Sequence, residues 1–223
     1  MRNLVIAIDG PSGAGKGTLA RSVARALGYR HVDTGAMYRA VAWKAAHDGV
    51  PLDDDGAVSA LAAAARLEQQ EGRITIDGHE VTRDIRTPAM DQAAASVAKL
   101  PGVRQALVAR QRGLGAEGGV VMEGRDIGTV VFPQADVKIY LDASAEERAR
   151  RRATDEAHTG GQQGSVAAVQ HELVARDRAD STRAIAPLTL APDAVYIDTT
   201  GMPIEVVVHR VMMIVHEKLT ENP

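Results

Sequence analysis

The stretch that decides the fold reads Gly10-Pro-Ser-Gly-Ala-Gly-Lys-Gly-Thr18. The residues before it, Leu4 to Ile8, form a short apolar and β-branched run that is typical of a strand buried on both faces. The residues after it repeat apolar side chains every four positions and predict a helix over 16–27. The sequence therefore places a glycine-rich loop between the first strand and its helix.

A loop of this kind binds phosphate, because its backbone amides turn toward phosphate oxygens and the helix dipole adds positive potential. The general pattern is Gly, four residues, Gly-Lys and then Ser or Thr, but here Gly17 comes before Thr18. This form resembles the loop of nucleoside-monophosphate kinases. The resemblance implies that Lys16 neutralises the β- and γ-phosphates of ATP and that Thr18 helps to position hydrated magnesium. The ATP-binding residues expected from it are Gly10, Pro11, Ser12, Gly13, Ala14, Gly15, Lys16, Gly17 and Thr18.

Further apolar runs predict the rest of the sheet. They cover 120–122, 137–141 and 195–197, and the short segment 29–32 adds a further strand, with helical patterns between them. About five strands that alternate with helices are the pattern of a doubly wound α/β sheet. Ligands bind at the carboxyl ends of the strands in such sheets.

One segment departs from this pattern. Residues 73–76 alternate between polar and apolar, Asp77-Gly78 is a strong hairpin turn, and residues 80–82 resume an extended pattern. We expect an antiparallel hairpin inserted into the α/β fold, within a substrate-binding insertion over 38–104.

Helices and a loop complete the expected order. Two helices are predicted over 88–100 and 103–114, with Pro101-Gly102 as the break between them. Residues 158–164 have the composition of a mobile loop between arginine-rich helical segments.

Composition narrows the class of protein. With 223 residues and 45% hydrophobic composition, the chain can bury one sizeable core beside a smaller insertion. It has no cysteine, which excludes disulfides, thiolate metal sites and a thiol nucleophile. The first apolar run is too short for a signal peptide or a membrane span. We expect a soluble cytoplasmic protein that does not bind membranes.

Charge points to a small anionic ligand. A net charge of -3 and 3% aromatic residues argue against a surface that coats nucleic acid. Arginines nevertheless gather in 104–112, 148–152 and 176–183. These clusters fit either a locally positive cleft for a small polyanion or solvated helix faces on which arginines pair with acids.

A phosphate loop alone does not separate kinases from switch GTPases and motor ATPases. A switch GTPase reads guanine through an Asn-Lys-x-Asp motif, but the chain's asparagines are Asn3 and Asn222. A motor ATPase usually carries one acid after a strand, whereas residues 120–126 supply two acids and an arginine. The histidines form no HExxH or other metal pattern. These features favour a kinase.

Three further motifs, together with the phosphate loop, span nearly the whole chain. They are Asp33-Thr-Gly-Ala-Met-Tyr-Arg39, Glu123-Gly-Arg-Asp-Ile-Gly-Thr-Val-Val-Phe-Pro133 and Arg176-Asp-Arg-Ala-Asp-Ser-Thr-Arg-Ala-Ile-Ala-Pro187. The combination resembles the bacterial type of cytidylate kinase. This family has an adenylate-kinase-like five-stranded parallel core, a small inserted antiparallel sheet and a lid. The resemblance implies a core over 1–37 and 105–223, a lid at about 148–168 and a nucleoside-monophosphate-binding insertion over 38–104.

The resemblance also implies the acceptor site. Arg39 and Arg125 would bind the acceptor phosphate, since guanidinium groups form paired hydrogen bonds with phosphate oxygens. Arg104 and Asp126 would read cytosine, and uracil would be disfavoured because it presents a carbonyl where cytosine has an amine. The expected CMP-binding residues are Thr34, Arg39, Arg104, Arg125, Asp126, Arg176, Asp180 and Arg183; the expected catalytic residues are Lys16, Arg125, Arg176 and Arg183.

For the lid and for the turn after the last strand, the resemblance implies less specific roles. Arg148, Arg151 and Arg152 would stack on adenine or bind ATP phosphates, and we assign Arg151 and Arg152 to ATP. Related sequences often carry a lysine in the lid loop that contacts a donor phosphate, whereas 158–164 has none. Thr199 to Pro203 would either frame the adenine through backbone groups or form a plain surface turn.

The expected activity is ATP-dependent phosphorylation of CMP, and also of dCMP, by a monomer that uses Mg²⁺ with ATP in pyrimidine metabolism. Two alternatives remain open from the sequence. One is a kinase for another monophosphate, such as UMP or AMP, or for a small metabolite. The other is a regulatory module that binds ATP without efficient turnover.

Overall fold

The computed structural model describes residues 3–70, 72–155 and 165–221. The chain divides into two compact units. The first unit comprises Met1–Asp33, Arg112–Ala153 and Gly164–Pro223, and the second comprises Thr34–Gln111 and Thr154–Gln163.

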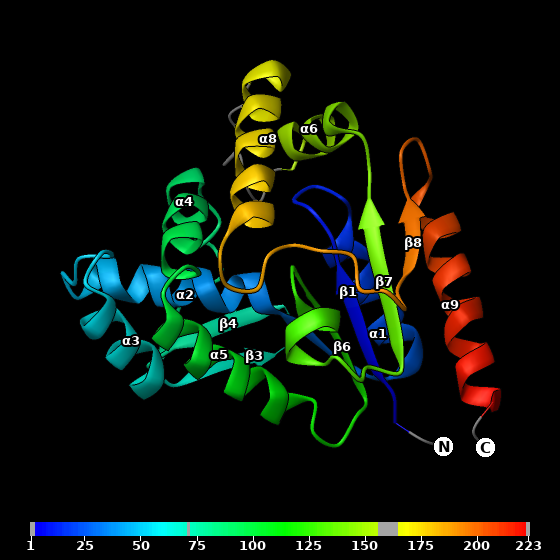
Figure 1. Cartoon of the computed structure of the whole chain (residues 1–223), viewed down its shortest axis with the longest axis horizontal. Helices are drawn as coiled ribbons and strands as arrows, with labels where there is room; N and C mark the ends of the chain where they lie inside the picture. Colours follow the sequence, from blue (N-terminus) through cyan, green and yellow to red (C-terminus); the bar gives the residue numbers. More distant parts are fainter. Residues whose placement is uncertain (1–2, 71, 156–164, 222–223) are drawn as a thin grey trace. The chain divides into compact units, whose positions relative to one another are not determined.

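A five-stranded parallel sheet forms the centre of the first unit, with the strand order β2-β6-β1-β7-β8 (Figure 1). The strands are β1 (Val5–Asp9), β2 (Arg30–Asp33), β6 (Val120–Gly124), β7 (Val137–Asp142) and β8 (Val195–Asp198). Ile6, Ala7 and Ile8 are fully buried although alternate residues point to opposite faces, so β1 is covered on both sides. The predicted doubly wound sheet is confirmed.

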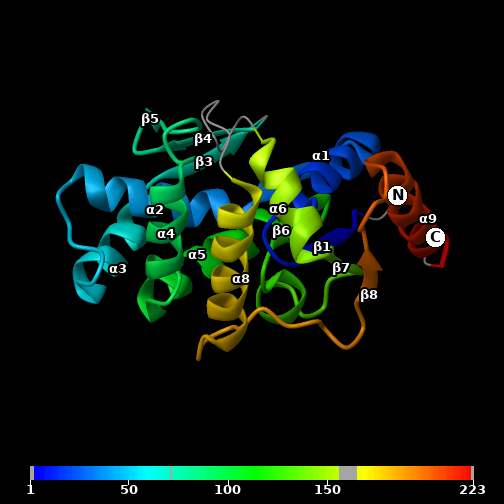
Figure 2. The same ribbon diagram turned by 90° about the horizontal axis from the view of Figure 1, so that it is seen from above.

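The helices of the first unit form two pairs. Helices α1 (Lys16–Leu27) and α9 (Ile204–Glu221) pack together against β1 and β7 through the hydrophobic core. Helices α6 (Ala145–Ala153) and α8 (Val166–Thr182) lie side by side (Figure 2). A π-helical turn, η1 (Ile127–Val131), follows β6 directly.

The second unit contains the inserted antiparallel sheet. Its elements are α2 (Thr34–His47), α3 (Asp55–Ala64), β3 (Leu67–Gln70), β4 (Arg73–Ile76), β5 (His79–Glu80), α4 (Pro88–Val97) and most of α5 (Pro101–Leu114). The predicted hairpin around Asp77-Gly78 joins β4 to β5, but β5 is shorter than the extended pattern over 80–82 suggested. The longer pairing is between β3 and β4, which the sequence analysis did not predict.

The two helices predicted before β6 are present, but the break between them lies at residues 98–100 and not at Pro101-Gly102. Helix α4 ends at Val97, and α5 begins at Pro101 rather than after it. Proline lacks an N–H and has a fixed φ, so it fits the first turn of a helix, where N–H groups have no partner in the helix. Pro101 therefore starts α5 instead of interrupting the helical region. In the described part of the chain, no helix has the length and apolar character needed to cross a membrane.

Candidate active site

The phosphate loop runs from the end of β1 to the start of α1. It needs glycine at positions with a positive φ angle and no room for a Cβ. Gly10 has φ 145°, and a Cβ there would lie 2.0 Å from the carbonyl oxygen of Leu141. Gly13 has φ 79°, and its Cβ would lie 2.9 Å from the carbonyl oxygen of Arg148. Both positions exclude larger residues, which fixes the path of the loop against β7 and α6.

Lys16 is buried at the start of α1, and its Nζ donates a hydrogen bond to the carbonyl oxygen of Pro11 at 2.7 Å. Burial and the positive charge of Arg125 lower the pKa of Lys16 to about 7, although the carboxylates of Glu123 and Asp9 oppose this shift. A polyphosphate placed on this loop would stabilise the charged form of the amine.

Oxygen ligands suitable for Mg²⁺ lie close to the loop. Thr18 is exposed in the first turn of α1. Glu123 is buried near the end of β6. Its carboxylate lies beside Gly17, since a Cβ added to that glycine would be 3.1 Å from Glu123 Oε1. Glu123 Oε1 also lies 3.0 Å from His31 Nε2. Hard oxygen donors of this kind are the ligands that a magnesium ion prefers. In the sequence, Glu123 stands out only as the first residue of the motif over 123–133.

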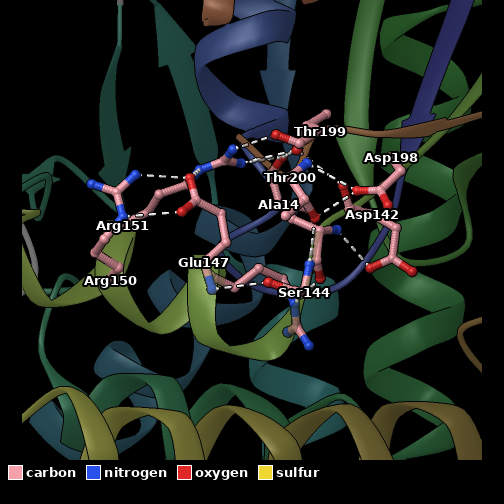
Figure 3. Close-up of polar contacts among 11 residues, drawn as sticks. Ala14, Asp142, Ser144, Glu147, Arg150, Arg151, Asp198, Thr199 and Thr200 are labelled. Carbon is pink, nitrogen blue, oxygen red and sulfur yellow. Dashed lines mark hydrogen bonds and ion pairs between the residues drawn. The ribbon is translucent and has the colours of Figure 1, made fainter. Parts of the chain in front are cut away.

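A pocket of about 220 Å³ opens beside the phosphate loop. It is lined by Ala14, Gly15, Thr18, Leu141, Glu147, Arg150, Arg151, Thr199, Met202, Ile204 and Val207. Arg151 and Thr199, both of which line the pocket, are bonded to each other (Figure 3): the guanidinium of Arg151 donates to the hydroxyl of Thr199 at 2.9 Å and to the carbonyl oxygen of Thr199 at 2.7 Å. Among the described residues, Arg150 and Arg151 line this pocket and Arg152 does not.

Thr199 joins three parts of this region. It is buried, and its hydroxyl lies 2.9 Å from the carbonyl oxygen of Asp142 and 3.3 Å from that of Ala14. Its amide also donates to the carbonyl oxygen of Asp142 at 2.8 Å. Residues 200–203 are exposed and begin with a turn, so within the segment from Thr199 to Pro203 only Thr199 is buried.

Arg148 is buried in α6 and binds protein groups. Its guanidinium donates to the carbonyl oxygens of Ala143 at 2.9 Å and Ser12 at 3.1 Å, and it forms a short ion pair with Asp177 on α8. Arg148 thus links the phosphate loop to α8.

Arg125 follows β6 at the carboxyl edge of the sheet. Its Nε donates to Asp180 Oδ2 at 2.8 Å, and its Nη1 donates to the carbonyl oxygen of Gly10 at 3.1 Å. Burial opposes the ionisation of Asp180, but the charges of Arg125, Arg176 and Arg183 outweigh it and hold the pKa of Asp180 below its ordinary value. The ionised carboxylate binds Arg125, which in turn contacts Gly10 of the phosphate loop.

Asp126 and Arg183 form a second pair nearby. Both side chains are buried, and Arg183 Nη2 lies 3.9 Å from Asp126 Oδ1. Arg183 Nη1 also lies 4.0 Å from Asp180 Oδ1. Arg176 and Asp180 are one turn apart on α8, so they share a face of the helix. The structure therefore brings together Arg125, Asp126, Asp180 and Arg183 from the predicted acceptor site.

The remaining predicted acceptor residues belong to the second unit. Thr34 is buried at the first position of α2. Arg39 Nη1 lies 3.8 Å from Asp91 Oδ1 on α4. Arg104 is buried on α5, with its guanidinium carbon 5.9 Å from the centre of the Tyr38 ring. These cationic side chains are held by neighbours within their own unit.

Asp9 was missed by the sequence analysis, which took it only as the end of the first strand. It is the last residue of β1, it is buried, and its carboxylate accepts hydrogen bonds from the amides of Ile127 and Gly128 at 2.8 and 2.7 Å. The sequence feature that pointed to Asp9 was its position, as an acidic residue between an apolar strand and the phosphate loop.

Residues 156–164 of the predicted lid, which include the predicted loop over 158–164, lie outside the described residues. Within the described ranges, no group of three or more His, Asp or Glu side chains is arranged to hold a metal ion.

The fold and the site define a class. A glycine-rich loop on the first strand of a parallel sheet, a buried lysine and a cluster of arginines at the same edge are the features of a P-loop phosphotransferase. The chain belongs to the cytidylate kinase family, whose model, described as cytidylate kinase, matches residues 6–217.

Individual relatives agree with this assignment. The chain is 50% identical over 225 residues to a cytidylate kinase of Solibacter usitatus, covering 99% of this chain and 96% of that protein. It is 46% identical over 221 residues to a cytidylate kinase of Desulfitobacterium hafniense, covering 98% of this chain and 95% of that protein.

A solved structure of shikimate kinase from Bacteroides thetaiotaomicron is similar in fold, with a TM-score of 0.50 and 13% identity over 96% of this chain and 98% of that chain. The predicted family, fold and enzyme class are confirmed.

Proposed function

We propose that this chain transfers the γ-phosphoryl group of ATP onto CMP and dCMP, forming the diphosphate and ADP, with the site residues named from the sequence. The observation that carries the proposal is the position of Arg125, which donates both to Gly10 in the phosphate loop and to Asp180. A guanidinium at this place is suited to bind a phosphate that receives the transferred group.

On the donor side, the loop from Gly10 to Thr18 cradles the phosphates of ATP, and Lys16 neutralises charge on the β- and γ-phosphates. The pocket beside the loop takes the adenine, with Arg151 and Thr199 at its wall. Arg152 completes the donor set as a proposed phosphate contact. Thr18 would hold hydrated Mg²⁺, which neutralises charge on the phosphates when bound.

On the acceptor side, Arg125, Arg176 and Arg183 bind the phosphate of CMP. Asp180 accepts a hydrogen bond from the sugar. Asp126 accepts from the exocyclic amine of cytosine, which is the group that uracil lacks. In the second unit, Thr34, Arg39 and Arg104 are the proposed CMP-binding residues.

Transfer needs no protein nucleophile. A phosphate oxygen of CMP attacks the γ-phosphorus in line, the bond from that phosphorus to the β–γ bridging oxygen breaks, and ADP leaves with the bridging oxygen. Lys16 and the arginines stabilise the negative charge spread over the transferred group. Positioning and charge neutralisation supply most of the acceleration. We further propose that the enzyme acts as a monomer in the cytoplasm.

A Lys16→Ala variant tests the proposed role of the phosphate loop. ADP formation from ATP and CMP is measured beside the wild type and Lys99→Ala, a matched change at an exposed lysine. We expect transfer to fall at least a hundredfold in Lys16→Ala, since one transition-state charge contact contributes about 3 kcal/mol or more, and to be unchanged in the control. Full activity of Lys16→Ala would refute the proposed catalytic role.

A further inference from the structure

Asp9 makes an unusual connection between two segments that are far apart in the sequence. Its Oδ1 accepts a hydrogen bond from the amide of Ile127 at 2.8 Å, and its Oδ2 accepts one from the amide of Gly128 at 2.7 Å. Ile127 and Gly128 are the first two residues of η1. The carboxylate of a residue on β1 therefore binds the amino end of the turn that follows β6.

The first N–H groups of any helical turn have no partner within that turn and need an acceptor. The usual acceptor is the side chain of the residue just before the turn. Asp126 occupies that position, but its side chain makes no capping hydrogen bond. Asp9 supplies both acceptor oxygens instead.

Because Asp9 accepts from these amides, the carboxylate of Asp126 is not needed as the cap of η1 and can contact other groups. Asp126 Oδ1 lies 3.9 Å from Arg183 Nη2, within the cluster that we assign to CMP. The neighbouring Arg125 is tied to the same end of β1, since its Nη1 donates to the carbonyl oxygen of Gly10 at 3.1 Å. The segment from Arg125 to Gly128 is thus fixed on both sides of Asp126, by the contact of Arg125 with Gly10 and by the contacts of two amides with Asp9.

We propose that Asp9 is a positioning residue for the acceptor site. It caps η1 from β1, and it thereby holds Arg125 and Asp126 in the places from which they bind CMP. The inference rests on the proposed function of these two residues.

The surroundings of Asp9 support this role. Gly128 packs closely here: a Cβ on it would lie 3.4 Å from Asp9 Oδ2 and 3.2 Å from the Lys138 side chain. A tight cage with two charge-assisted hydrogen bonds gives the segment little freedom to shift. Burial raises the pKa of Asp9 to about 6, while the two amides favour the charged form.

The test is Asp9→Asn, which keeps the shape but replaces one acceptor oxygen by an NH₂ group facing an N–H. We expect the KM for CMP to rise about tenfold, from the loss of roughly one hydrogen bond's stabilisation of the turn. We also expect the preference for CMP over UMP to fall several-fold, with the KM for ATP within about twofold of the wild type.

Asp136→Asn is the matched control. Asp136 Oδ2 accepts a hydrogen bond from the amide of Val5 at 2.8 Å, at the opposite end of the same strand. Its loss should lower the midpoint of thermal unfolding without changing the KM for CMP. If Asp9→Asn behaves like this control, with lower stability and unchanged KM and CMP preference, the positioning role is overturned.

Two further measurements keep the test decisive. If Asp9→Asn does not fold, amide hydrogen exchange of the wild type replaces it: the amides of Ile127 and Gly128 should exchange as slowly as those of β1, and exchange at the rate of open loops would overturn the proposal. Absence of CMP phosphorylation in the wild type would instead contradict the proposed function, which separates the two failures.

Discussion

The carboxylate of Asp180 accepts a hydrogen bond from Arg125 Nε at 2.8 Å, and this contact joins α8 to the segment that follows β6. Arg125 in turn donates to Gly10 in the phosphate loop. One carboxylate therefore orients an arginine that lies between the proposed donor and acceptor phosphates. Two arginines of the acceptor set, Arg176 and Arg183, contribute to the lowered pKa of Asp180.

The first prediction concerns this contact. Asp180→Asn should lower kcat/KM for CMP roughly 10- to 100-fold, because charge-assisted hydrogen bonds contribute about 1.5–3 kcal/mol. Steady-state kinetics with CMP varied at saturating ATP measures the effect. Asp53→Asn, a change at an exposed aspartate of the second unit, should behave like the wild type. A loss confined to the KM for ATP would contradict the assignment of Asp180 to the acceptor.

The second prediction concerns protons. Since the pKa of Lys16 is lowered to about 7, this amine is mostly neutral at pH 8 in the free protein. The phosphates of ATP favour its charged form, so ATP binding at pH 8 should take up close to one proton. Titration calorimetry in two buffers with different ionisation enthalpies measures the uptake. The uptake should be absent in Lys16→Met, and equal uptake in that variant would assign the proton to another group.

The third prediction concerns the pocket beside the phosphate loop. Thr199→Val removes the hydroxyl that contacts Arg151 and the carbonyl oxygen of Asp142. The KM for ATP should rise several-fold, as expected for about 1 kcal/mol from one hydrogen bond, while the KM for CMP stays constant. Thr199→Ser should restore the wild-type value, and Thr220→Val on the exposed end of α9 serves as the control. An equal change in both KM values would argue against an adenine pocket.

The fourth prediction concerns stability and pH. The ordinary pKa of an aspartate is 3.8, whereas that of Asp9 in the fold is about 6. Between these values the folded protein keeps a proton that the unfolded chain releases, so this residue's contribution to stability falls as pH rises from about 4 to 6 and is lost above that range. The cost of ionising Asp9 in the fold is up to about 3 kcal/mol.

Urea unfolding of the wild type and Asp9→Asn between pH 4 and 7.5 measures this cost. The variant cannot ionise, so its free energy of unfolding relative to the wild type should increase over this interval. A difference between the two proteins that stays constant with pH would show that Asp9 titrates normally.

Local patterns in the sequence predicted the sheet well. The strands β1, β6 and β7 are short, largely apolar runs, and the sequence pattern detects them because both of their faces are buried. The edge strand β2 has only one fully buried residue. The helix over 16–27 was predicted with the bounds that the structure has. The strand β3 was missed because Leu67–Gln70 contains one apolar residue among polar ones, and its pairing with β4 is set by tertiary contacts.

Site residues could be predicted from the sequence only where they belong to a recognisable motif. The phosphate loop combines residue types and a spacing that rarely occur together outside phosphate-binding sites. The roles of Asp9 and Arg148 could not be predicted, because each acts on backbone groups that folding brings from more than a hundred residues away. A sequence does not record which backbone amides and carbonyls lack partners, and those groups decide where a buried charge is needed.

The most direct test of the account compares acceptors. ADP formation from ATP in the presence of Mg²⁺ is measured with CMP, dCMP, UMP, AMP or GMP, for the wild type and for Asp126→Ala. We predict strong preference of the wild type for CMP and dCMP and loss of that preference in Asp126→Ala, because Asp126 is the proposed acceptor for the amine of cytosine. Equal use of UMP by the wild type, or preference for a purine monophosphate, would contradict the account.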